Sequence, residues 1–181
     1  WKKSYIIPIH KSGARSEISN YREIALLCAI PKLYEKIVCD KFVQYIMRFT
    51  DINQHGFMKG RSTETNMTTF MNYLLMNMEK GGQVDAIYTD FSKAFDRVNH
   101  DLLSGKLLCL GVPIGFVKWI SSYLSDRTQN VRINNHLSKD VIVYSGVPQG
   151  NHLGPVLFTI FVNDLCLCLD DCMYLLYAND L

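Results

Sequence analysis

The sequence predicts an α+β fold, and three observations lead to this class. Short β-branched stretches and helical stretches are mixed without the strict strand–helix alternation of a parallel α/β sheet. No internal repeat or linker divides the 181 residues, so one compact domain or a unit of two lobes is expected. The 48% hydrophobic content can fill a core, and no apolar run reaches the roughly 18 residues of a membrane-spanning helix.

One strand and one helix are expected in the first part of the chain. Residues 4–9 include three β-branched isoleucines and are expected to form a short strand, and Pro8 among them favours the edge of a sheet. A polar loop at residues 11–20 follows. Pro31 then opens a helix that runs through Ile46, because apolar side chains recur there at helical spacing.

A second helix is expected at residues 63–78, after a loop at residues 51–62. Three apolar side chains share one stripe of this helix: Phe70, Leu74 and Met78. Its methionines are expected to fill the core, because the flexible thioether packs into irregular apolar gaps.

The remaining elements are bounded by capping and turn residues. In chain order they are a strand at residues 86–88, a helix at 99–110, a helix at 113–124, a hairpin pairing 131–133 with 141–144, a buried helix at 153–164 and a strand at 173–177. Asn99 caps the first of these helices, Gly111 ends it and Pro113 starts the next. Asn134 and Asn135 form the turn of the hairpin. Asp170 and Asp171 are expected to lie in a loop.

Six cysteines are spread through the chain, mostly among Leu, Ile and Val. Cys166, Cys168 and Cys172 form the one tight cluster, but they lack a nearby His and the usual zinc spacing. Free thiols in a reducing, intracellular setting are therefore expected.

The net charge of +2 hides an uneven distribution. Residues 1–61 carry a net charge of +6, and residues 62–181 carry −4. This split indicates one part that meets polyanions and one that holds cations. An accident of surface composition explains the same numbers equally well.

Two motifs point to nucleotide chemistry. Asp90 closes an apolar strand and Asp96 follows six residues later, an arrangement that suits a hard cation such as Mg²⁺. A helix cap or turn residue is the alternative for Asp90. The stretch 145–150, Ser-Gly-Val-Pro-Gln-Gly, allows a ligand to approach the backbone before a helix N-terminus. An ordinary tight loop is the alternative here.

A third motif, residues 177–180, is by itself an Asn-Asp turn. The order and spacing of the three motifs, however, resemble the reverse transcriptase domain of non-LTR retrotransposons, most closely the jockey type. The resemblance runs from Trp1 to Leu181. Further matching stretches lie at residues 6–13, 20–22, 31–36, 54–63 and 161–165.

This resemblance implies a right-hand polymerase in which fingers occupy about residues 1–80 and palm about 81–181. The palm is expected to be an antiparallel sheet backed by helices, with the thumb beyond Leu181 and an endonuclease before Trp1. The implied reaction copies an RNA template onto a DNA primer from deoxynucleoside triphosphates, with two Mg²⁺ ions or Mn²⁺ in their place. The family is expected in nucleus and cytoplasm, without membrane attachment.

The resemblance also assigns roles to single residues. Asp90 and Asp180 match metal-binding aspartates, and Asn179 stands at the position of a third. The other matches are Lys11 and Arg22 at the triphosphate, Phe95 as the gate against a ribose 2′-hydroxyl, Gln149 and Gly150 at the incoming nucleotide, and Lys59 and Arg61 at the template backbone. For Lys11 a solvated surface position, and for Phe95 core packing, are the alternatives.

Three residues depart from the family pattern. Asn179 replaces an Asp, Asn151 replaces a Ser, and Glu23 replaces a Pro. Two interpretations follow from Asn179. The chain is a reverse transcriptase domain, expected to be inactive in this copy if the missing Asp is essential, or it is a nucleic-acid-binding remnant of a decayed element that has lost the chemistry.

Overall fold

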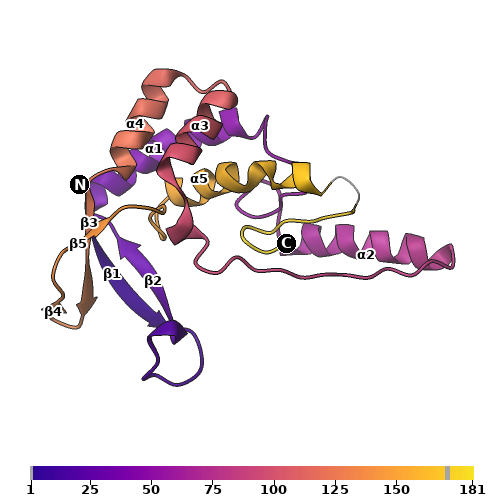
Figure 1. Cartoon of the computed structure of the whole chain (residues 1–181), viewed down its shortest axis with the longest axis horizontal. Helices are drawn as coiled ribbons and strands as arrows, with labels where there is room; N and C mark the ends of the chain where they lie inside the picture. Colours follow the sequence, from indigo (N-terminus) through magenta and orange to yellow (C-terminus); the bar gives the residue numbers. More distant parts are fainter. Residues whose placement is uncertain (1, 170–171) are drawn as a thin grey trace.

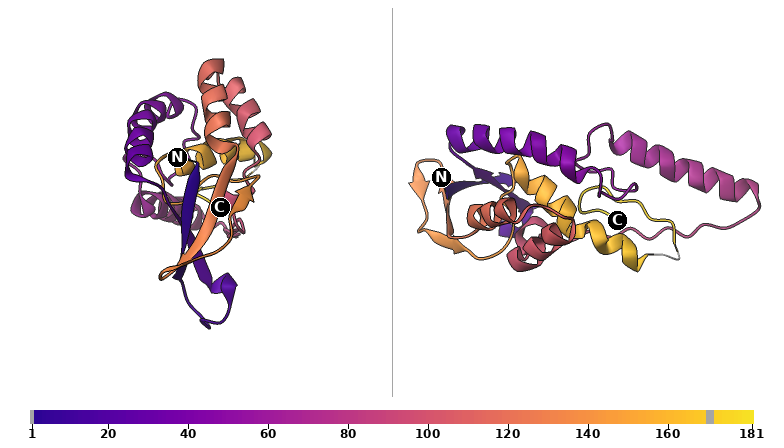
Figure 2. Two further views of the ribbon diagram at one scale, coloured as in Figure 1. Left: turned by 90° about the vertical axis from the view of Figure 1, so that its left-hand side faces the viewer. Right: turned by 90° about the horizontal axis from the view of Figure 1, so that it is seen from above.

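The structure is a computed structural model, and it describes residues 2–169 and 172–181. Figure 1 shows a twisted sheet at one end, a group of packed helices beside it, and a long helix that extends away from both. Figure 2 shows helix α5 (Leu153–Val162) lying between α1 (Ala29–Ile46) and α3 (His100–Cys109). The α+β class is confirmed. The expected loop at residues 170–171 lies outside the described residues.

The sheet is mixed and centred on β1 (Lys3–His10). On one side β1 pairs antiparallel with β2 (Tyr21–Leu26), and on the other it pairs in parallel with β3 (Arg127–Ile133). Ile6 lies opposite Ala25 on β2 and opposite Val131 on β3. The side chains of Ile6 and Ala25 are buried, which ties the sheet to the apolar interior.

The prediction that β1 is an edge strand was wrong. β1 is central for its first half, because β3 pairs with it as far as Ile6. Pro8 lies beyond that last pair and opposite Glu23 on β2. The pairing of β1 with β3 therefore does not need the N–H that proline lacks. Strand β2 was not predicted, because the charged pair Arg22 and Glu23 hides its alternation.

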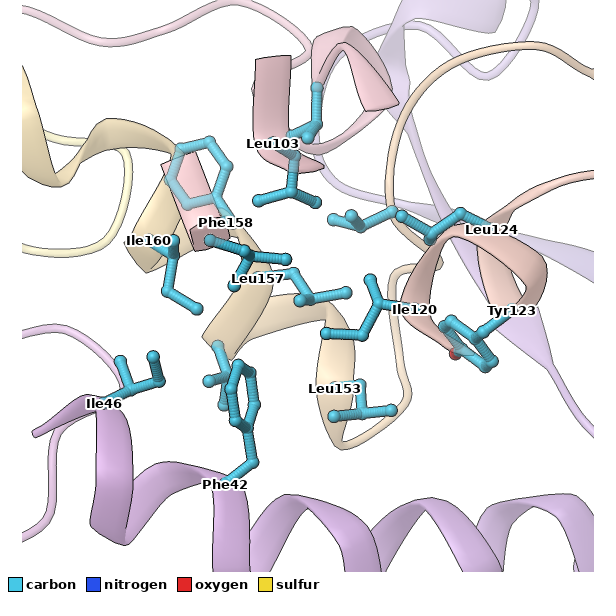
Figure 3. Close-up of a cluster of buried hydrophobic side chains, with 14 of the residues drawn as sticks. Phe42, Ile46, Leu103, Ile120, Tyr123, Leu124, Leu153, Leu157, Phe158 and Ile160 are labelled. Atoms are coloured by element: carbon cyan, nitrogen blue, oxygen red, sulfur yellow. The ribbon is translucent and has the colours of Figure 1, made fainter. Parts of the chain in front are cut away.

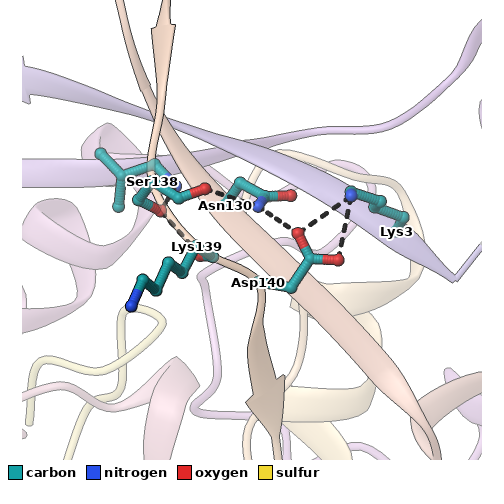
Figure 4. A network of polar contacts seen from close by, with 6 residues as sticks. Lys3, Asn130, Ser138, Lys139 and Asp140 are labelled. Carbon is teal, nitrogen blue, oxygen red and sulfur yellow. Dashed lines mark hydrogen bonds and ion pairs between the residues drawn. The ribbon is translucent and has the colours of Figure 1, made fainter.

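The predicted pairing of residues 131–133 with 141–144 was wrong, because Arg132 and Ile133 pair with residues 136–137 and the segment 141–143 pairs with residues 127–129. The hairpin itself turns at Asn134 and Asn135 as predicted, and Asn134 adopts the left-handed conformation that such turns require (φ +53°). Its return strand is divided into β4 (His136–Leu137) and β5 (Val141–Val143), which both pair antiparallel with β3. The pairing register shifts by one residue between them, which marks a bulge. Figure 4 shows how Asn130 fills the bulge.

The bulge is held by a small polar network. Asn130 Nδ2 donates to the carbonyl of Ser138 (3.0 Å) and to the carboxylate of Asp140. Lys3 Nζ lies 3.0 Å from both Asp140 oxygens, and these bonds hold the pKa of Asp140 below its usual range. The network joins β1 to the hairpin (Figure 4).

The predicted helices form close to their expected bounds. Asn99 caps α3, and its side-chain oxygen accepts from the N–H groups of Asp101 and Leu102. Helix α4 (Ile114–Leu124) follows Pro113, as expected. Pro31 lies within the first turn of α1, where its missing N–H leaves no unpaired acceptor.

Short 3₁₀ segments complete the chain. They are η1 (Ile18–Asn20), η2 (Phe95–Arg97) and η3 (Asn163–Cys168). The last of these continues α5, so the helix expected at 153–164 ends as a tighter turn.

The core lies where α5 meets α1, α3 and α4. Figure 3 shows side chains from these four helices converging on one cluster. Its labelled members are Phe42, Ile46, Leu103, Ile120, Tyr123, Leu124, Leu153, Leu157, Phe158 and Ile160. Seven of the ten residues of α5 are buried, in agreement with the prediction of a buried helix.

Helix α2 (Thr63–Glu79) forms as predicted, but its methionines do not fill the core. None of its residues is buried, and Met67, Met71 and Met78 are exposed. The helix starts with a capping box between Ser62 and Thr65, which stabilises it without tertiary packing. Because α2 extends away from the core (Figure 1), its apolar stripe has no core to enter.

The strands expected at residues 86–88 and 173–177 do not form ladders. Ile87 and Tyr88 are 84% and 78% exposed, so no apolar surface holds that segment as a strand. The antiparallel pairing expected of the palm is reduced to isolated bridges of Asp180 with Asp90 and with Tyr177, and Leu176 instead forms a parallel bridge with Gln54.

Two further expectations from the sequence concern the cysteines and membrane-spanning helices. All six cysteines are free thiols, and only Cys39 is buried. Burial raises the pKa of the Cys39 thiol to about 11. Among residues 2–169 and 172–181, no three His, Cys, Asp or Glu side chains group as metal ligands. No helix in the same ranges has the length and apolar character to cross a bilayer.

Candidate active site

Residues 177–180 form a tight reverse turn, here called the catalytic turn. Tyr177 N–H donates to the Asp180 carbonyl (2.8 Å), and Asp180 N–H donates to the Tyr177 carbonyl (3.0 Å). Ala178 adopts φ +59°, in the left-handed region that is uncommon for residues other than glycine. Asn179 follows it at the tip of the turn.

The chain around Asp90 pairs with the end of this turn. Thr89 exchanges two backbone hydrogen bonds with Leu181 (2.7 and 3.0 Å), and Asp90 lies opposite Asp180. Directly opposed residues of an antiparallel pair present their side chains on the same face. Two carboxylates far apart in the sequence are thus brought side by side.

Asn179 lies between these two carboxylates. Its Nδ2 donates to Asp90 Oδ1 (2.6 Å) and lies 3.4 Å from Asp180 Oδ1. Because both partners are acceptors, the amide nitrogen rather than the oxygen must face them. Burial raises the pKa of Asp180, and the neighbouring charge of Asp90 raises it further.

The donor set fits a divalent cation in part. Asp90 and Asp180 supply the carboxylate oxygens that Mg²⁺ prefers, and their mutual repulsion favours a bound positive charge. The Asn179 amide nitrogen cannot ligate a cation, and it takes up one oxygen of Asp90. The site therefore holds two of the three carboxylates that the family resemblance implies.

Phe95 lies in η2 and is linked to the turn at residues 177–180 through Phe57, which follows Gly56 beside Ala178. Its ring stacks on Phe158 (centroids 4.8 Å apart), and Phe57 meets it edge-on at 6.0 Å. The Phe95 ring is half-buried, so the structure gives it both a packing surface and an open edge. Asp96, the second acidic residue of the motif, is exposed, and desolvation of its carboxyl by the surrounding chain raises its pKa.

The glycine-containing loop at residues 145–150 is hydrogen-bonded to the segment that carries Phe95. Val147 N–H donates to the Phe95 carbonyl and Gly146 N–H donates to the Val98 carbonyl, both at 2.8 Å. A Cβ on Gly146 would lie 2.7 Å from Asp96 Cα, so only glycine allows this approach. The loop and Phe95 therefore form one unit.

The end of the same loop rests on strand β2. Ala25 N–H donates to the Gln149 carbonyl (2.9 Å). Gly150 has φ +100°, and a Cβ there would lie 3.0 Å from Ile24 Cγ2. Gln149 and Gly150 are thereby placed at the junction of the sheet and the helices.

The predicted cationic residues lie apart from the acidic site. Lys11 and Arg22 are exposed and lie at the end of the β1–β2 hairpin that points away from the helices (Figure 1). Lys59 is exposed as well. Arg61 binds the protein's own backbone. Its Nη1 donates to three carbonyls, those of Asp51, Ile52 and Gln54.

Residues 9–181 match the family described as reverse transcriptase (RNA-dependent DNA polymerase). The chain belongs to this family. The family resemblance inferred from the motifs is therefore confirmed.

Similar reverse transcriptases come from mobile elements. The chain is 34% identical to a probable RNA-directed DNA polymerase from transposon BS of Drosophila melanogaster over 168 residues. It is 31% identical over 172 residues to the RNA-directed DNA polymerase from mobile element jockey of the same species. Both alignments cover 91% of this chain and 18% of the relative, so the chain spans about a fifth of their length.

Solved telomerases show the same fold. The structure of apo telomerase from Candida tropicalis, truncated from the C-terminal domain, matches with a TM-score of 0.65 and 13% identity. The match covers 99% of this chain and 43% of that one. At this identity the likeness confirms the reverse transcriptase fold and says nothing of the chemistry.

Two departures from the reverse transcriptase pattern are accommodated without strain. Asn151 Oδ1 accepts from Gly154 N–H (2.9 Å) at the start of α5, and its Nδ2 donates to the Tyr123 hydroxyl. Tyr123 in turn donates to the fully buried Glu35 (2.6 Å), and burial raises the pKa of Tyr123. Glu23 is exposed on β2, where a charged residue is tolerated.

Sequence reasoning missed three residues of this reverse transcriptase site. Gln54, Gly56 and Phe57 contact Ala178 or Phe95, although no role was assigned to them. They lie in the stretch 54–63, which was recognised only as a family marker. The role of Gln54 leaves no local signal in the sequence, because its partner Ala178 is 124 positions away.

Proposed function

We propose that the chain forms fingers and palm of an RNA-directed DNA polymerase from a jockey-like non-LTR retrotransposon. The observation that carries the proposal is the pairing of Asp90 with Asp180. Phe95 and the glycine loop docked on it are linked to the turn at residues 177–180 through Phe57 and Gly56, so the groups that nucleotidyl transfer needs come from one region of the fold. Fingers at about residues 1–80 and palm at 81–181 follow from the same proposal.

The proposed substrates are an RNA template, a DNA primer and deoxynucleoside triphosphates. The names of the relatives support this, since they are RNA-directed DNA polymerases of mobile elements. A telomerase of the same fold was solved with a fragment of telomeric RNA. The proposal includes the family expectation that the protein works in nucleus and cytoplasm.

Asp90 and Asp180 would hold the divalent cations, two Mg²⁺ or Mn²⁺ in their place. When bound, the cations stabilise the oxygens that attack and leave at the α-phosphate. The protein's own contribution is to keep both carboxylates on one face, aligned by the backbone bridge between them. Burial raises the pKa of Asp180, and the charge of the neighbouring Asp90 raises it further.

The incoming nucleotide would lie along the gate and the glycine loop. The open edge of Phe95 excludes a ribose 2′-hydroxyl, and the Phe158 stack behind it keeps the ring from moving away. Gln149 and Gly150 would contact the nucleotide. Lys11 and Arg22 would hold the triphosphate, which requires the β1–β2 hairpin to close toward the palm.

Lys59 and Arg61 are proposed to meet the template backbone, in the basic first third of the chain. Of the two residues, Lys59 is the more accessible to a template, because its side chain is exposed. Arg61 also organises the loop before α2 through its three carbonyl partners. Its substitution would therefore alter the loop as well as the charge.

Asn179 lowers the activity of this copy, on the same proposal. Its amide nitrogen lies where a carboxylate and a cation are needed, and it bridges Asp90 and Asp180 by hydrogen bonds instead. This observation favours the second candidate function, a nucleic-acid-binding remnant without chemistry. Both candidates keep the template contacts and differ only in catalysis.

Primer extension on an RNA template with the full-length protein tests the proposal. Extension by the Asn179→Asp variant that is abolished by Asp90→Asn supports the polymerase. Template binding without extension in every variant supports the remnant. Extension that survives Asp90→Asn contradicts the assignment of this carboxylate.

A further inference from the structure

The loop between α1 and α2 joins the chain that leads into the catalytic turn. Gln54 forms a parallel bridge with Leu176. Leu176 N–H donates to the Asn53 carbonyl (2.9 Å), and His55 N–H donates to the Leu176 carbonyl (2.8 Å). Asn66 Nδ2 donates to the same carbonyl at 3.3 Å. The residues before the turn are thus anchored to a second segment along their backbone.

The Gln54 side chain extends this anchor into the turn itself. It is 2% exposed, and its Oε1 accepts from Gly56 N–H (2.7 Å) and from Ala178 N–H (3.0 Å). Because both partners are backbone donors, the amide oxygen must face them. Gln54 Nε2 has no partner among the described residues, so the fold uses this side chain as an acceptor.

Gly56 allows the turn to lie directly against the loop. A Cβ at this position would lie 2.1 Å from the Ala178 nitrogen and 2.7 Å from its Cα. Ala178 is the one residue of the turn with a left-handed backbone, which costs an L-residue free energy. Such a conformation persists where the surroundings determine it, and here they consist of Gln54 and Gly56.

We propose that Gln54 is a positioning residue for nucleotidyl transfer: its oxygen holds Ala178 in the conformation that brings Asn179 and Asp180 to Asp90. This inference rests on the proposed function of Asp90 and Asp180. Gln54 is buried, so it acts through the turn. Ala178 directly precedes the site, and a misplacement of reacting groups by ~1 Å costs roughly a hundredfold in rate.

Two substitutions separate the hydrogen bond from the bulk of the side chain. Gln54→Met keeps the length but removes the acceptor, and Gln54→Glu keeps an oxygen at the same distance. Gln44→Met is the matched control, because Gln44 is exposed on α1. All three are made in the full-length protein.

Hydrogen exchange at the Ala178 amide is the first readout, and it requires no activity. The amide should exchange about fivefold faster in Gln54→Met than in Gln44→Met, because a single hydrogen bond contributes about 1 kcal/mol. Gln54→Glu should retain protection close to that of the unsubstituted protein. Amides of α5 report whether the whole domain has opened instead.

Primer extension in the Asn179→Asp background is the second readout. Gln54→Met should lower kcat at least tenfold with a nearly unchanged KM for the nucleotide, and Gln54→Glu should recover most of it. Equal exchange and equal kcat in Gln54→Met and Gln44→Met overturn the proposal, as does a Gln54→Glu variant that behaves like Gln54→Met. If the α5 amides show that Gln54→Met opens the whole domain, the exchange of the Ala178 amide and the kcat of Gln54→Glu decide the proposal instead. If Asn179→Asp shows no extension, the proposed function fails, and exchange at Ala178 still decides whether Gln54 holds the turn.

Discussion

Replacing Asn179 with Asp should change this site more than any other single substitution. The Asn179 amide donates to Asp90 at 2.6 Å and lies 3.4 Å from Asp180. An aspartate there loses both contacts and adds a negative charge beside two others. At about 4 Å, each pair of like charges costs ~1 kcal/mol in water and ~4 kcal/mol near a protein surface. Without divalent cations the variant should therefore be less stable.

With divalent cations the sign reverses, because the added carboxylate becomes a ligand. A unit charge at about 4 Å from a divalent cation gains ~2 kcal/mol even in the limit of bulk water. A gain of ~3 kcal/mol in the transition state corresponds to roughly a hundredfold in rate. We expect near-background extension for the sequence as it stands and about a hundredfold more for Asn179→Asp. Mn²⁺ should rescue the unsubstituted protein in part.

Two assays check this expectation at matched protein concentration. Primer extension on an RNA template compares the two proteins in Mg²⁺, and thermal melting compares them with EDTA and with Mg²⁺. Asn72→Asp, an exposed position on α2, controls for the added charge. Similar extension rates for both proteins in Mg²⁺ would show that the account of this site is wrong. A melting temperature of Asn179→Asp that ignores Mg²⁺ would contradict it independently.

Three further predictions address separate parts of the molecule. Phe95→Ala in the Asn179→Asp background should raise ribonucleotide incorporation relative to deoxynucleotide by about tenfold or more, measured by competing extension; unchanged discrimination would remove Phe95 as the gate. Lys59→Ala should lower the slope of log affinity against log salt for an RNA–DNA duplex by about one. Glu64→Ala, which removes a negative charge instead of a positive one, should not lower this slope. Asp140→Asn should destabilise the protein at neutral pH, because the folded-state pKa of Asp140 lies below its usual range. This advantage of the unsubstituted protein should be present above the unfolded-state pKa of about 3.9 and should disappear as pH falls through the folded-state value, as chemical denaturation at several pH values would show. A difference that stays constant down to acid pH would refute the role of the Lys3–Asp140–Asn130 network.

The local signals were sufficient for most helices. Asn99 and Pro113 mark helix starts through a side-chain cap and a backbone limit, and the structure places helices after both of them. The turn at Asn134 follows from the tolerance of Asn for a left-handed backbone. These features depend on neighbours within a few positions, so sequence alone reveals them.

The sheet order and the fate of apolar stripes depend on distant segments. Strand β1 was expected at an edge because of Pro8, but β3 pairs with it over the residues before Pro8. The methionines of α2 have the spacing of a core stripe, yet the helix extends away from the core. Periodicity states that a face is apolar and leaves open what covers it.

What the sequence by itself determined was the family, the chemical types at the site and the substitution at Asn179. Motif order carries that information, because each motif keeps its residues at fixed spacing. Only the tertiary structure decided that the Asn179 amide bridges Asp90 and Asp180, that Arg61 binds carbonyls, and that Gln54 holds Ala178. The physical reason is that a buried backbone N–H must find an acceptor, and folding can supply one from anywhere in the chain.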